Sequence, residues 1–112
     1  MSDATPALSE LADLMGTMGH PDRLRILLEL QDSPKDVATL VQAVGLSQSR
    51  TSQHLGLLKA HHLVRAQRNG RRVFYQLTSP EITLWILQGV GFINIQQNLN
   101  SSIQALLTAY KP

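Results

Sequence analysis

The chain has 112 residues, a length that suits one domain, and it contains no cysteine. Disulfides, thiolate metal sites and thiol redox sensing by this chain are therefore excluded. The net charge is only +2, but six basic and no acidic residues lie within residues 47–78, whereas residues 82–110 carry no charge. This imbalance predicts a polyanionic partner, and a solvated basic surface is the alternative.

Apolar spacing predicts a helix over residues 7–18 and a second helix over residues 21–31, with Pro21 in its first turn. A helix-turn-helix is predicted over residues 36–60. Its first helix ends at Gly45, which suits a left-handed C-terminal residue, and Ser47 caps the second helix.

Alternating apolar and polar residues around Asn69-Gly70 predict a β-hairpin over residues 63–78. Pro80 then opens a last helical region, residues 80–110, which is either one helix or two. No feature of residues 1–13 resembles a secretion signal, so a cytoplasmic location is expected. The predicted fold is a single, mainly α winged helix-turn-helix domain with a small hairpin wing.

Three blocks of this sequence, "HPDRLRILLEL", "LSQSRTSQHLGLLKAHHLV" and "NGRRVFYQLT", resemble the ArsR/SmtB family of winged-helix repressors in order and spacing. The resemblance covers roughly residues 14–78. The family consists of small homodimeric bacterial repressors, many of which release their operator when a metal or another effector binds. The resemblance implies a dimeric repressor that occupies double-stranded DNA at a promoter.

On the second helix of the helix-turn-helix, Ser52, Leu55 and Leu58 share the face that is expected to turn inward. The opposite face carries short polar and amide side chains that can approach base edges, and its arginine can contact guanine or phosphate. Ser47 and Thr51 suit phosphate contacts, although such residues can also simply cap and solvate a helix. The DNA-contacting residues expected on this helix are Ser47, Gln48, Ser49, Arg50, Thr51, Gln53 and His54.

Three arginines and an asparagine surround Gly70 at the expected tip of the wing. An ordinary soluble hairpin explains Asn-Gly but not three arginines in five positions. We expect these side chains to enter a minor groove or to contact phosphates. The wing residues expected to bind DNA are Arg68, Asn69, Arg71 and Arg72.

The histidines raise the question of a metal site. Adjacent side chains such as His61 and His62 diverge on a helix and chelate poorly. His62 occupies a position at which the family usually has glycine, and histidine tolerates the left-handed conformation better than most residues. His20, with Asp22 and perhaps Asp13, is the least implausible cluster. We expect no metal and no cofactor.

The resemblance also implies positions for the family's sensor sites. The arsenic-type cysteine pair corresponds to Asp36 and Ala38, which cannot bind a soft ion. In the zinc-type site on the last helix, only Glu81 could serve as a ligand. An effector is therefore unknown. The positions that correspond to the zinc-type site are about Ser79, Glu81, Phe92 and Ile95.

The uncharged last region is too rich in amides to span a membrane. Apolar residues on more than one side of it predict a contact between two subunits, and the resemblance implies pairing of the terminal helices across a two-fold axis. Such a dimer would place two recognition helices about 34–36 Å apart on an imperfect palindrome. The expected interface residues are Leu11, Met15, Ile82, Trp85, Ile86, Gly89, Phe92 and Ile93.

A DNA-binding transcriptional regulator, most simply a repressor, is thus the function that the sequence favours. The alternatives are a metal-responsive regulator with an unusual His/carboxylate site and a protein-interaction module that keeps the winged-helix shape. No paired carboxylates, phosphate-binding glycine loop or catalytic triad is recognisable, so an enzyme is not expected.

Overall fold

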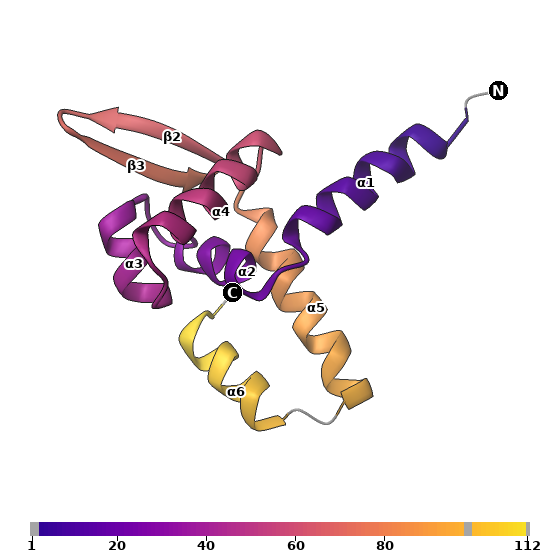
Figure 1. Ribbon diagram of the computed structural model, residues 1–112. Helices are drawn as coiled ribbons and strands as arrows, with labels where there is room; N and C mark the ends of the chain where they lie inside the picture. Colours follow the sequence, from indigo (N-terminus) through magenta and orange to yellow (C-terminus); the bar gives the residue numbers. More distant parts are fainter. Residues whose placement is uncertain (1–2, 98–99, 112) are drawn as a thin grey trace.

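The computed structural model describes residues 3–97 and 100–111, and the side chains of residues 94–97, Ile95 among them, lie outside this description. Within these described residues, six helices and three strands follow one another, and the predicted winged helix-turn-helix is confirmed (Figure 1). Their bounds are α1 (Thr5–Met18), α2 (Pro21–Glu29), β1 (Lys35–Asp36), α3 (Val37–Val44), α4 (Gln48–Ala60), β2 (Val64–Asn69), β3 (Arg72–Leu77), α5 (Glu81–Gln97) and α6 (Asn100–Ala109).

Local capping explains where the helices of the helix-turn-helix begin and end. The Asp36 carboxylate accepts a hydrogen bond from the Thr39 N–H at 2.9 Å and caps α3. Gly45 ends α3 with a left-handed φ of 71°, a conformation that glycine adopts without steric cost. The Ser47 hydroxyl accepts from the Arg50 N–H at 3.1 Å and caps α4, as the sequence predicted.

The wing is the outer part of a three-stranded antiparallel sheet in the order β1-β3-β2. Strand register pairs Asn69 with Arg72, so the turn residues are Gly70 and Arg71, one position later than the Asn-Gly signal suggests. Gly70 has a φ of 66°, as the first turn residue of a type II′ hairpin requires. Arg71 therefore lies at the tip of the wing.

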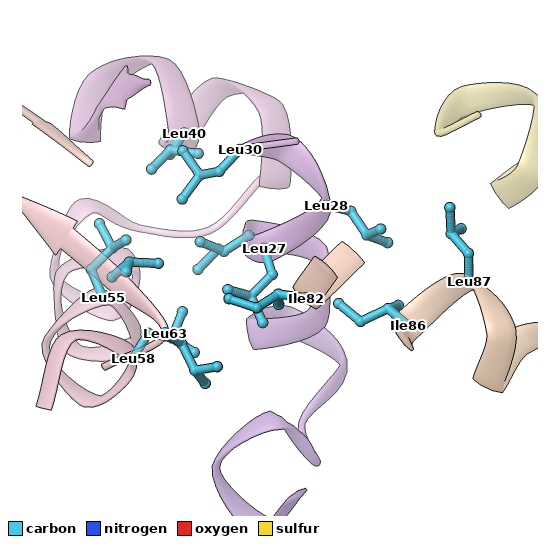
Figure 2. Close-up of a cluster of buried hydrophobic side chains, with 12 residues drawn as sticks. Leu27, Leu28, Leu30, Leu40, Leu55, Leu58, Leu63, Ile82, Ile86 and Leu87 are labelled. Carbon is cyan, nitrogen blue, oxygen red and sulfur yellow. The ribbon is translucent and has the colours of Figure 1, made fainter. Parts of the chain in front are cut away.

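The core lies around α2, which contacts α3, α4 and α5. Figure 2 shows Leu30, which follows α2, beside Leu40 of α3, and Leu28 on the side of α2 that faces Ile86 of α5. Leu27 is fully buried near Ile82. The core therefore attaches the helix-turn-helix directly to the first turns of α5.

The last helical region is two helices, because α5 ends at Gln97 and α6 starts at Asn100. α6 turns back toward α2 (Figure 1). The Tyr110 hydroxyl accepts a hydrogen bond from Arg25 Nε at 3.1 Å and donates one to the Glu29 carboxylate. These bonds tie the segment that follows α6 to α2, and the contribution of residues 80–110 to dimerisation stays a prediction.

An apolar surface remains exposed along α1 and α5. Met15 is 60%, Trp85 51% and Phe92 65% exposed, and an apolar groove of about 350 Å³ lies between the two helices. Of the expected interface residues, Ile82 and Ile86 are mostly buried in the core of the same chain, and Ile86 also lines this groove. Within the described residues, no helix is long and apolar enough to cross a membrane.

Candidate nucleic-acid interface

The outer face of α4 is polar and open to solvent. Gln48, Ser49, Arg50 and Gln53 are all exposed, as expected from the sequence. The exposed Ser47 stands at the helix N-terminus, where unpaired backbone N–H groups and the helix dipole favour a phosphate. This face therefore presents hydrogen-bond donors and acceptors on side chains of different lengths.

The expected orientation of Thr51, Ser52 and His54 is wrong. Thr51 is fully buried, and its hydroxyl donates to the Ser47 carbonyl at 2.9 Å, which satisfies the polar group inside the fold. His54 is only 8% exposed, whereas Ser52 is exposed. Leu55 and Leu58 are buried as predicted, but Thr51 and His54 take the place of Ser52 on the buried face. Neither Thr51 nor His54 presents its side chain to a partner here.

His54 packs behind the exposed face of α4, against the start of α2. Its ring centroid lies 4.8 Å from that of His20, at an interplanar angle of 51°. One oxygen of Asp22, Oδ2, lies 3.9 Å from His20 Nδ1 and 3.9 Å from His54 Nε2. The same oxygen lies 3.8 Å from Arg50 Nη2, so Asp22 connects this group to the exposed face of α4.

The electrostatic setting keeps His54 neutral at pH 7. Burial lowers the pKa of His54, and the nearby His20, Arg23 and Arg50 lower it further, while Asp22 acts in the opposite direction. The His54 Nδ1 atom is buried and has no hydrogen-bond partner among the described residues. His20 also caps α2, because its Nδ1 accepts the Asp22 N–H at 3.1 Å.

The wing arginines fall into two groups. Arg72 donates to Asp36 Oδ2 from Nε at 3.0 Å and also from Nη2. Within residues 3–97 and 100–111, Arg68 and Arg71 form no ion pair, so their charges are free to meet an anion. The exposed Asn69 lies between them at the tip.

A further arginine lies lower on the wing. Arg65 faces Gln76 across β2 and β3. Once the Gln76 amide is turned so that both groups are satisfied, its oxygen accepts from Arg65 Nε at 2.5 Å and from Nη2 at 2.6 Å. The unpaired cations of the wing therefore concentrate at its tip.

His62 has the backbone role that the sequence suggested. Its φ is 60°, and it follows the C-terminal end of α4. The His62 N–H bonds the Lys59 carbonyl at 3.0 Å and the Leu63 N–H bonds the Leu58 carbonyl at 2.9 Å, which is the Schellman pattern. This turn directs the chain from the end of α4 into β2 and so fixes the orientation of the wing relative to α4.

Sequence reasoning missed the acidic partners of the interface. Asp22 and Asp36 each hold an arginine that was expected to bind DNA, namely Arg50 and Arg72. Asp36 stands at the capping position of α3, and this position says nothing of a partner 36 residues later. Asp13, considered beside His20, is replaced in that cluster by His54.

The comparisons with known proteins agree with this geometry. The model of the family described as bacterial regulatory protein, arsR family, matches residues 20–66. The biofilm growth-associated repressor of Xylella fastidiosa is 36% identical over 79 residues, which cover 70% of this chain and 69% of that protein.

Two solved structures are also similar. NolR from Sinorhizobium fredii has a TM-score of 0.71 and 33% identity, over 83% of this chain and 93% of that one. The homodimeric winged helix-turn-helix DNA-binding domain Mb0332 from Mycobacterium bovis has a TM-score of 0.72 and 26% identity, over 86% and 92%. The chain therefore belongs to the arsR family of bacterial regulatory proteins.

Proposed function

We propose that this protein is a cytoplasmic, sequence-specific DNA-binding repressor that acts as a homodimer on an imperfect palindrome. One observation carries the proposal: among the described residues, the exposed polar face of α4 lies in the same molecule as a wing tip on which Arg68 and Arg71 form no ion pair. α4 would lie in the major groove, and the wing would contact phosphates or the adjacent minor groove.

The roles of the residues follow from their chemistry. Gln48, Ser49 and Gln53 carry the hydrogen-bonding groups suited to base edges, and Arg50 can contact guanine or phosphate. Arg68 and Arg71 would neutralise phosphates without regard to sequence. We leave Thr51 and His54 out of the proposed DNA-binding residues because both side chains are buried.

The exposed apolar surface of α1 and α5 supports the homodimer. A protein of this size seldom leaves several large apolar side chains exposed on neighbouring helices without a partner. Leu11, Met15, Trp85, Phe92 and Ile93 remain the proposed contacts. Gly89 is exposed among them, and no other described residue has an atom within 4 Å of the place that a Cβ would take there.

The experiment is fluorescence anisotropy of labelled DNA from immediately upstream of the gene, titrated over a series of salt concentrations. Arg71→Ala should weaken binding to all sequences and reduce the slope of log affinity against log salt by about 0.9 for each phosphate that is no longer neutralised. Gln48→Ala should leave the salt dependence unchanged and relax discrimination at particular bases. Unchanged affinity in both variants would remove this surface as the DNA-binding site.

A metal-responsive regulator is a second candidate, favoured by one observation. Over the part of the chain that the structure describes, His20, Asp22 and His54 form one group of three potential ligands, with ligand atoms within 4.8 Å of one another. Against it, His20 Nδ1 already accepts the Asp22 N–H, and Asp22 lies beside Arg50. Zn²⁺ also takes about four ligands.

Cobalt titration of chelator-treated protein distinguishes the two candidates. The first candidate predicts no ligand-field absorption band and unchanged DNA affinity. A stoichiometric band that is abolished in both His20→Asn and His54→Asn would favour the metal-responsive regulator, because asparagine at position 20 can still cap α2.

A further inference from the structure

Asp36 stands at the junction between the helix-turn-helix and the wing. Its Oδ1 accepts the Thr39 N–H and caps α3, while its Oδ2 accepts both hydrogen bonds from Arg72. β1 makes this possible, because it places Asp36 opposite Phe74 on β3, two residues from Arg72. A single carboxylate therefore connects the start of α3 to the wing tip.

The Arg72 guanidinium is held on a second side as well. Its Cζ lies 5.1 Å from the centroid of the Phe74 ring, within the range of a cation–π contact. Two hydrogen bonds from one planar guanidinium to a carboxylate fix its direction more firmly than one contact does. Arg72 thus has a defined place, in contrast to Arg68 and Arg71.

The link persists at any pH that a cell presents. The hydrogen bonds from Thr39 and Arg72 hold the pKa of Asp36 well below its ordinary value. A carboxyl group with a lowered pKa loses its stabilising contribution only as the pH falls toward that lowered value. Asp36 is therefore a permanent anion beside Arg72.

We propose that Asp36 is a positioning residue that holds Arg72 and thereby fixes the wing on the helix-turn-helix, leaving Arg68 and Arg71 as the DNA-contacting cations of the wing tip. The inference rests on the DNA-binding function proposed above. A two-stranded hairpin alone is only marginally ordered in water. Arg72, whose charge is matched by Asp36, adds little to the release of counterions from DNA.

Asp36→Asn isolates the link. Asparagine keeps an oxygen for the α3 cap, where the two residues perform similarly, but it removes the negative charge that Arg72 requires. Arg72→Ala removes the other partner. Arg71→Ala is the matched control, since it deletes a neighbouring arginine that forms no ion pair within residues 3–97 and 100–111.

The proposal predicts different effects of these variants on DNA affinity and on its salt dependence. Asp36→Asn and Arg72→Ala should each weaken binding about 3- to 10-fold, and the double variant should be no weaker than either single one. The slope of log affinity against log salt should stay as in the wild type in Arg72→Ala, and Asp36→Asn, which leaves the Arg72 charge unmatched, should not flatten it. Arg71→Ala should instead flatten that slope. An Arg72→Ala slope as flat as that of Arg71→Ala would overturn the proposal.

Amide hydrogen exchange of the free protein gives a readout that needs no DNA. Backbone amides of residues 64–77 should exchange faster, and to the same extent, in Asp36→Asn and Arg72→Ala than in Arg71→Ala. Unchanged exchange in Asp36→Asn would refute the positioning role. If the wild type shows no salt-dependent DNA binding, the proposed function fails, and the exchange result still decides whether Asp36 holds the wing.

Discussion

His62 is the one non-glycine residue with positive φ among residues 3–97 and 100–111. Its N–H and that of Leu63 close the turn after α4, and the Thr78 hydroxyl donates to the His62 carbonyl at 2.7 Å. A left-handed conformation costs an L-residue about 1–2 kcal/mol, and histidine occupies it at this cost. The strain is confined to His62, because the hydrogen bonds around this residue fix the conformation of the turn.

His62→Gly should raise the free energy of unfolding by about 0.5–1 kcal/mol, since relief of the left-handed strain exceeds the added entropy of the unfolded chain. Chemical denaturation measures the change. His61→Gly is the control: its φ is −97°, so it gains no relief and should be neutral or destabilising. A His62→Gly protein less stable than the wild type would contradict this explanation of the turn.

His54 should make stability depend on pH. Its pKa is lowered in the folded state, so the unfolded chain takes up a proton first as the pH falls below about 6.5. The His54 contribution is therefore present above that pH and is lost on acidification. The groups that face it are His20, Asp22, Arg23 and Arg50.

The measurement is the free energy of unfolding of the wild type and His54→Gln between pH 7.5 and 5. The variant should show a shallower loss of stability on acidification, whereas exposed His61→Gln should follow the wild type. Parallel curves for the wild type and His54→Gln would show that His54 is not the titrating group.

The sequence anticipated backbone roles better than side-chain environments. Ser47, Gly45 and His62 have short-range functions that depend on residue type and immediate neighbours, and all three were predicted. Thr51 and His54 were placed on the wrong face. The period of a helix follows from its own residues, but its rotation depends on what packs against it, here His20 of α2.

At the scale of elements, helices and the hairpin were predictable because each carries its own periodicity or turn signal. β1 has two residues and no pattern, and it exists only because it pairs with β3. The return of α6 onto α2 depends on contacts between Tyr110, Arg25 and Glu29, which are distant in sequence. Contacts of this kind could not be predicted from the sequence, because only the folded chain brings these residues together.

The apolar surface of α1 and α5 provides the prediction at this scale. Phe92→Glu places a charge in the proposed dimer interface, where it would be desolvated, while Phe92 itself contributes little to the core of one chain. We expect Phe92→Glu to sediment as a monomer in sedimentation-velocity experiments and to lose DNA affinity. In thermal denaturation it should still unfold with a midpoint, as a folded protein does.

Ala105→Glu on the exposed side of α6 is the matched control, because it adds the same charge at a position that is not among the proposed interface residues. It should leave the oligomeric state and the DNA affinity unchanged. A dimeric Phe92→Glu protein would place the subunit contact elsewhere.

At the scale of the whole molecule, the sequence predicted a winged helix-turn-helix with a basic recognition surface, and the family membership and the fold confirm the winged helix-turn-helix. The acidic residues that organise the basic surface were not predictable. Asp22 and Asp36 belong to the acidic first part of the chain, and the fold brings them to Arg50 and Arg72 in the basic part. The acidic and basic residues that are separated along the sequence are thus partly paired with one another in the fold.

The proposed function requires a symmetric dimer that presents two α4 helices to DNA. Hydroxyl-radical footprinting on the tightest sequence selected from a random DNA pool is the experiment that addresses this requirement. We expect two protected segments centred about one helical turn apart, roughly 10 base pairs, and related by a dyad. A single protected segment, or protection without two-fold symmetry, would contradict the symmetric dimer on DNA.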